Sequence, residues 1–202
     1  MKVRDHKSLV AKLLATENIK VRYDKVSTAS FNPVGRELIL PIYKTELSND
    51  ELDLFIGHEV GHALFTPAVN PQEYSKGRPN FHDVLNVVED ARIERLVQEK
   101  FPGLKRNFVN GYRDLIDRKF FGQYDPKTLG FVNRINLWFK TKDPEISFSP
   151  EEMQIVEEIE DSKTFEEVLD ITERIFSRYS DNPEQNRDED KEEQEEQQHK
   201  IG

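Results

Sequence analysis

Apolar side chains recur along this chain with two different periods, and the change of period predicts where strands give way to helices. Residues 5–17 carry apolar side chains at helical spacing, whereas residues 19–31 alternate and are rich in β-branched side chains. After the turn signal N-P-V-G comes R-E-L-I-L-P-I-Y at 36–43. This pattern predicts a strand pair or a small sheet, and Pro41 favours an edge position for the last strand.

Beyond residue 48 the pattern is helical. Ser48 and Glu51 have the spacing of a capping box, and the helix that they begin ends before Pro67. A loop rich in Pro, Asn and Gly follows at 68–80, and a second helix is predicted over 81–99. Further helices are predicted over 107–121, 128–140, 150–160 and 164–179. The expected fold class is therefore α+β, with a small N-terminal sheet, a helix behind it and a mostly helical C-terminal lobe.

The end of the chain differs from the rest in composition. Residues 181–200 contain no Leu, Ile, Val, Phe or Trp, and their nine acidic and three basic residues carry −6 of the formal charge of −10. Such a segment cannot bury enough apolar surface to offset the entropy lost on ordering. We therefore expect one domain over 1–180 and a disordered acidic tail or linker over 181–202. The domain itself is only mildly acidic, which argues against nucleic acid as its partner.

Two absences from the sequence limit the chemistry. There is no cysteine, so any metal must be held by His, Asp or Glu. No apolar run reaches the roughly 20 residues that cross a bilayer, and the N-terminus lacks the pattern of a signal peptide. We therefore expect a cytoplasmic protein without a membrane partner.

The first long helix carries the residues of a metal site. In H-E-V-G-H, His58 and His62 lie four residues apart, so both imidazoles share one helix face and can bind one ion. Neutral imidazole suits Zn²⁺, and Glu59 lies about 100° around the helix from His58. From there Glu59 can take a proton from metal-bound water without binding the metal, as in zinc metallopeptidases. The alternative is a core helix with two hydrogen-bonded histidines.

A catalytic zinc takes three protein ligands and keeps one position open, so a third ligand is expected downstream. The second long helix contains L-N-V-V-E-D-A-R-I-E-R-L, where carboxylates lie among apolar side chains. An unpaired carboxylate is costly in such surroundings, and a metal ion is a natural partner for it. We predict Glu89 as the third ligand, with Asp90 or Glu94 accepting a hydrogen bond from the other nitrogen of a histidine. The alternative is that these acids are surface charges paired with the arginines of the same stretch.

Three residues outside these motifs are candidates for stabilising the oxyanion of a tetrahedral intermediate. His82, at the start of the second helix, is the first, and Tyr74 and Tyr112 are the others. The alternative for His82 is a helix-capping or surface histidine. For the tyrosines it is packing or hydrogen bonding at the surface.

Together these motifs resemble a known group of enzymes. H-E-V-G-H followed on a later helix by a glutamate resembles the gluzincin branch of the zincin metallopeptidases. More closely, H-E-V-G-H-A-L-F-T-P followed by N-V-V-E-D-A-R-I-E resembles the peptidase-like N-terminal module of phage and bacterial proteins related to the CobT subunit of cobaltochelatase. That resemblance covers residues 20–125. CobT-like relatives keep a similar E-x-A-R-V-E without the histidine motif, which favours Glu89 over Asp90 as the shared residue.

The resemblance implies a zincin-like domain with an edge strand beside the cleft, for which A-S-F-N-P and R-E-L-I-L-P are candidates. It also implies Zn²⁺ bound by His58, His62 and Glu89, and hydrolysis of a peptide or protein substrate with Glu59 as the general base. The related proteins often carry a von Willebrand factor A domain after an acidic linker. The alternative is therefore a catalytically silent binding module that docks a von Willebrand factor A or ATPase partner. The location implied is the cytoplasm of a bacterium or of a phage-infected host cell.

Overall fold

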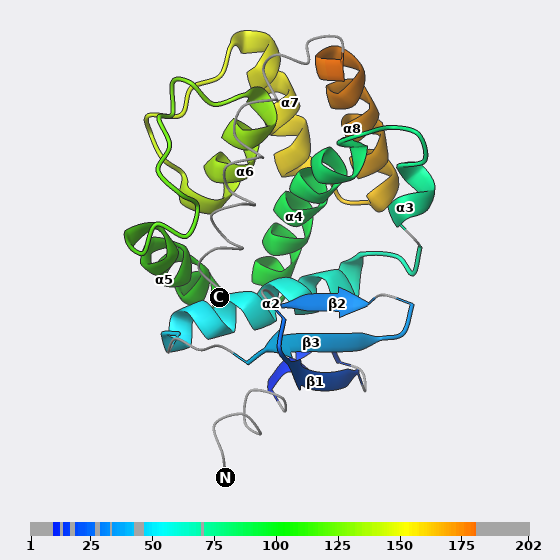
Figure 1. The fold of residues 1–202 in the computed structure, drawn as a ribbon, viewed down its shortest axis with the longest axis vertical. Helices are drawn as coiled ribbons and strands as arrows, with labels where there is room; N and C mark the ends of the chain where they lie inside the picture. Colours follow the sequence, from blue (N-terminus) through cyan, green and yellow to red (C-terminus); the bar gives the residue numbers. More distant parts are fainter. Residues whose placement is uncertain are drawn as a thin grey trace.

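The computed structural model has an α+β fold, with a three-stranded sheet at one end of a mostly helical body (Figure 1). It describes residues 10–12, 14–16, 19–26, 29–32, 34–42, 47–69 and 71–180. The acidic tail expected over 181–202 and much of the helix expected over 5–17 lie outside the described residues.

The sheet is mixed, and its strand order is β1-β3-β2. Its strands are β1 (Lys20–Asp24), β2 (Ser30–Asn32) and β3 (Glu37–Pro41). The central strand β3 pairs parallel with β1 and antiparallel with β2. The edge position predicted for the strand that ends at Pro41 is therefore wrong. Pairing with β2 extends only to Ile39, so the missing N–H of Pro41 interrupts no ladder on that side.

The predicted long helices are confirmed, with ends that differ from the prediction by up to four residues. They are α2 (Asn49–Phe65), α4 (Phe81–Lys100), α5 (Leu104–Asp117), α6 (Phe131–Thr141), α7 (Pro150–Asp161) and α8 (Phe165–Ser180). A short helix, α3 (Pro71–Tyr74), lies within the predicted loop. The capping box of α2 is formed as expected: Ser48 Oγ accepts the N–H of Glu51, and the Glu51 carboxylate accepts the N–H of Ser48. None of the helices in the described part of the chain is long and apolar enough to cross a membrane.

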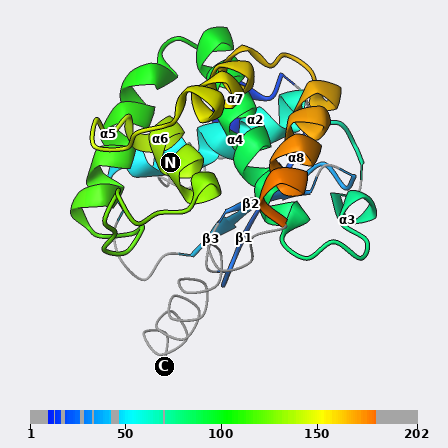
Figure 2. The ribbon, with the colours of Figure 1, turned by 90° about the horizontal axis from the view of Figure 1, so that it is seen from above.

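Helix α4 joins the two halves of the core. Val97, near its end, packs in a cluster with the sheet, α2 and α5, while Val84 and Val88 pack in a second cluster with α6, α7 and α8. In Figure 1 the sheet lies below α2, and α4 rises from α2 into the helical lobe. Figure 2 shows α4 near the middle of the molecule, with α5 and α6 on one side of it and α8 on the other.

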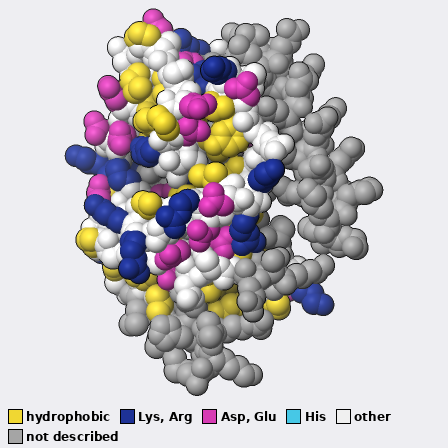
Figure 3. Space-filling model, turned by 90° about the vertical axis from the view of Figure 1, so that its left-hand side faces the viewer, with side chains coloured by type: hydrophobic (Ala, Val, Ile, Leu, Met, Phe, Trp, Pro, Cys, Tyr) yellow, Lys and Arg dark blue, Asp and Glu magenta, His cyan; other side chains and the backbone are white. Residues whose placement is uncertain are grey.

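Helices α2 and α4 approach closely at Gly61. A Cβ atom at this position would lie 2.9 Å from Cδ1 and 3.2 Å from the carbonyl oxygen of Ile93, so a larger residue would force the two helices apart. The glycine that the sequence places between two histidines therefore sets the distance between the two helices that carry the candidate site. On the face shown in Figure 3, acidic, basic and hydrophobic side chains of the described residues are interspersed, and charge of one sign does not gather there.

Candidate metal centre

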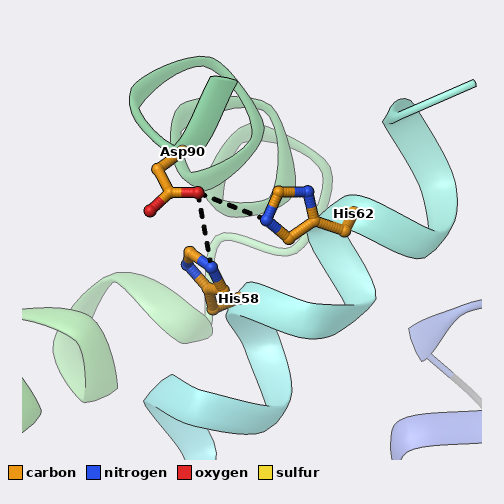
Figure 4. Close-up of side chains that lie close together, drawn as sticks. All are labelled: His58, His62 and Asp90. Atoms are coloured by element: carbon orange, nitrogen blue, oxygen red, sulfur yellow. Dashed lines mark ion pairs between the residues drawn. The ribbon is translucent and has the colours of Figure 1, made fainter. Parts of the chain in front are cut away.

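Three side chains converge where α2 crosses α4. His58 and His62 extend from consecutive turns of α2, and Asp90 of α4 faces both imidazoles (Figure 4). Oδ1 of Asp90 lies 3.3 Å from Nε2 of His62 and 3.6 Å from Nε2 of His58. Two ligands bound about 2.0–2.1 Å from a tetrahedral ion lie about 3.3–3.4 Å apart, so these atoms are spaced for a shared ion. The three potential ligand atoms all lie within 4.8 Å of one another.

The structure brings Asp90, rather than Glu89, to the two histidines. Glu89 is buried, and its carboxylate accepts hydrogen bonds from Nε and Nη2 of Arg92 at 2.8 and 2.7 Å and from Oγ1 of Thr66 at 2.5 Å. Neighbouring residues on a helix point about 100° apart, so the two acids cannot both face the imidazoles. Glu89 instead faces the end of α2. It is paired with an arginine, but in the interior rather than at the surface.

A second set of contacts orients both histidines. Nδ1 of His58 lies 2.8 Å from Oε1 of Glu94, which also accepts the hydroxyl proton of Tyr112. Nδ1 of His62 lies 3.0 Å from Oγ1 of Thr66, and this hydroxyl already donates its proton to Glu89. Both Nδ1 atoms therefore act as donors, and both Nε2 atoms face Asp90, where a metal ion can take the place of a proton. Glu94 has the orienting role that we expected for Asp90 or Glu94.

Without a metal, protons balance the charge of this cluster. Burial alone would lower the pKa of His58, but the carboxylates of Asp90 and Glu94, with Glu59 beyond them, raise it to about 9. Burial alone would raise the pKa of Asp90, but the charge of His58, the hydrogen bond with His62 and the charge of Lys140 bring it below its ordinary range. At neutral pH the metal-free site therefore holds an imidazolium at His58 against an ionised Asp90.

A divalent metal should consequently compete with a proton for His58. Because its pKa is raised to about 9, we expect metal binding at pH 7 to release about one proton. The apparent affinity for the metal should rise about tenfold per pH unit from pH 7 and level off above pH 9.

The raised pKa of His58 also stabilises the metal-free fold below about pH 6.5, and this stabilisation is lost as the pH rises through 9.

Chelator competition at several pH values, with calorimetry in buffers of different ionisation enthalpy, measures both the affinity and the released proton. His82→Ala is the matched control, because it removes a histidine from outside the cluster. An affinity that does not change between pH 7 and 9 would contradict the proton competition.

Glu59 lies beside the cluster but is not one of its three members. Its side chain is buried, and its carboxylate accepts a hydrogen bond from the backbone N–H of Phe31 in β2. Burial raises the pKa of Glu59, an effect that the nearby His58 and His62 oppose. A carboxylate with a raised pKa is a stronger proton acceptor than an ordinary one, as a general base requires.

The other residues considered from the sequence lie in different places. His82 is only half-buried and hydrogen-bonds to Asn86, and eight residues of helix place it about 12 Å along α4 from Asp90. The structure thus does not bring His82 to the centre. Tyr112 is buried and donates its hydroxyl proton to Glu94, which contacts His58. The ring of Tyr74 packs edge-on against Phe165, in the helical lobe.

Sequence reasoning missed two residues of the centre. Thr66 follows His62 by four residues, so helical spacing was a signal that it lies on the same face. Lys140 of α6 has its Nζ 3.6 Å from Oδ2 of Asp90, and nothing in the sequence distinguishes it from other lysines.

Comparison of the chain with models of known protein families, with curated proteins and with solved structures finds no match. The function must therefore be inferred from the geometry of the site.

Proposed function

We propose that this protein is a zincin-like, zinc-dependent metallopeptidase in which His58, His62 and Asp90 hold the ion and Glu59 is the general base. The observation that carries the proposal is the convergence of two Nε2 atoms and Oδ1, with both Nδ1 atoms engaged as donors behind them. Two neutral imidazoles and one carboxylate are a typical donor set for catalytic zinc and leave a fourth position for water. Bound zinc would lower the pKa of that water to about 7 and polarise the scissile carbonyl.

The chain's own residues supply the proton transfer. Glu59 follows His58 directly and is buried at the edge of the cluster, where it can accept a proton from the attacking water and deliver it to the leaving amine. The N–H of Phe31 fixes one orientation of its carboxylate. A pure scaffold needs no such base, which favours an enzyme over a silent binding module.

The position of strand β2 favours a peptide or protein as the substrate. It lies at the edge of the sheet, next to α2. The N–H of Phe31 reaches Glu59, and the N–H and C=O of one strand residue point to the same side, so the carbonyl of Phe31 also points away from β3. An extended peptide can pair with such an edge and present its scissile bond to the centre.

Two adjacent carboxylates provide the test of the ligand set. We expect about one zinc per chain in the wild type, less than about one tenth of that in Asp90→Ala, and nearly full loading in Glu89→Gln at saturating zinc, with an affinity about tenfold lower. Elemental analysis after dialysis against buffered zinc measures this, and it also distinguishes zinc from iron. Loss of the ion from Glu89→Gln with retention in Asp90→Ala would restore Glu89 as the ligand.

Activity is tested with the same proteins on a peptide library. Cleavage that a chelator abolishes and zinc restores is the expected result. A wild type that holds zinc but cleaves nothing would favour the silent module with a von Willebrand factor A or ATPase partner.

A further inference from the structure

Lys140 extends from the last turns of α6 to the candidate metal centre. Its Nζ lies 3.6 Å from Oδ2 of Asp90, and only 15% of its side chain is exposed. The other oxygen of the same carboxylate, Oδ1, faces the two imidazoles. One oxygen of the Asp90 carboxylate therefore faces the two imidazoles, and the other faces Lys140.

We propose that Lys140 is a positioning residue that makes Asp90 present a single oxygen to the metal. This inference rests on the metal centre proposed above. A carboxylate binds metals through one oxygen or through both, and a second bound oxygen would add a fifth ligand that crowds the position that catalysis needs for water. By holding Oδ2, Lys140 keeps the carboxylate from turning and leaves that position open.

A simpler role would make Lys140 only a counter-charge for Asp90. The two roles predict effects of opposite sign on metal affinity. A cation close to a metal ion repels it, so removal of a mere counter-charge would leave the affinity unchanged or raise it. Removal of a positioning group should weaken binding, because the carboxylate is then free to adopt other orientations.

The chain offers a matched control two residues away. Lys142 carries the same charge, but its side chain is 52% exposed, and it lies 3.7 Å from Glu160 and over the ring of Trp138. Lys142→Met therefore removes a lysine from the same segment without touching the centre. Lys140→Met removes the contact to Asp90, and Lys140→Arg keeps a cationic donor.

The experiment measures zinc affinity by chelator competition and the visible absorption spectrum of the Co²⁺-loaded full chain. We expect Lys140→Met to lower the zinc affinity about tenfold. It should also weaken the Co²⁺ absorption, because a second carboxylate oxygen converts a four-coordinate ion into a five-coordinate one. Lys142→Met should change neither property, and Lys140→Arg should stay within about threefold of the wild-type affinity.

Lys140→Met with unchanged or higher affinity and an unchanged Co²⁺ spectrum would overturn the positioning role alone. A wild type that binds neither ion would overturn the proposed function together with it, so the two failures are distinguishable. Circular dichroism checks that each variant folds. If Lys140→Met does not, Lys140→Gln gives the same two readouts with a neutral side chain of similar length.

Discussion

Glu59→Gln should abolish peptide hydrolysis and leave the metal in place. We expect a loss of about 10³-fold or more, because the amide cannot accept the proton of the attacking water. The fold should be unaffected, since glutamine has the size of glutamate and its carbonyl oxygen can still accept the N–H of Phe31. Its neutral amide also costs less to bury than an ionised carboxylate.

The measurement is the cleavage rate of a peptide substrate together with the zinc content of the same sample. Glu99→Gln is the control, because this glutamate lies on α4 with 56% of its side chain exposed and pairs with Arg95, not with His58, His62 or Asp90. A zinc-loaded Glu59→Gln protein that hydrolyses peptides at the wild-type rate would remove Glu59 as the base. Another group would then have to move the proton.

Local signals made much of the fold predictable. The capping boxes at Ser48 and Ser149 depend on contacts within four residues, and both helices begin where the sequence indicated. The strand order was less accessible, because pairing of β1 with β3 depends on contacts between distant segments. The edge position predicted from Pro41 was wrong for this reason. The neighbour on that side, β2, is three residues long and ends before it reaches the proline.

The candidate site was also predictable only in part. His58 and His62 share a helix face at any rotation of α2, so their convergence follows from spacing alone. The third residue depends on the rotation of α4 about its axis, which no local signal determines when Glu89 and Asp90 both lie in an apolar stretch. In the structure, the close packing of α2 and α4 at Gly61 directs Asp90 to the histidines.

Each charged residue of E-D-A-R-I-E has a separate task in the structure. Asp90 faces the two imidazoles, Glu94 orients His58, and Glu89 is held by Arg92 while it accepts the hydroxyl proton of Thr66. The buried acids of this stretch were correctly expected to need partners. Which partner each one has is a property of the packed helices.

Arg92→Ala should destabilise the protein by about 3–5 kcal/mol, the usual cost of leaving one member of a buried ion pair without its partner. Arg92 is 2% exposed, and its guanidinium forms two hydrogen bonds to Glu89. It also donates at 3.0 Å to the carbonyl of Phe65 at the end of α2 and at 3.0 Å to that of Lys163 before α8. Its removal would leave the buried carboxylate of Glu89 without its cationic partner. It would also remove the hydrogen bonds that link α4 to the end of α2 and to the segment before α8.

Urea unfolding of the metal-free chain measures this cost, with Arg95→Ala as the control. Arg95 pairs with the exposed Glu99 and donates to the carbonyl of Ser162, so its loss should cost only about 1 kcal/mol. The double variant Glu89→Gln/Arg92→Met should be more stable than the sum of its single variants predicts, because it buries no unpaired charge. Equal destabilisation by Arg92→Ala and Arg95→Ala would show that the buried contacts of Arg92 contribute no more to stability than the more exposed contacts of Arg95.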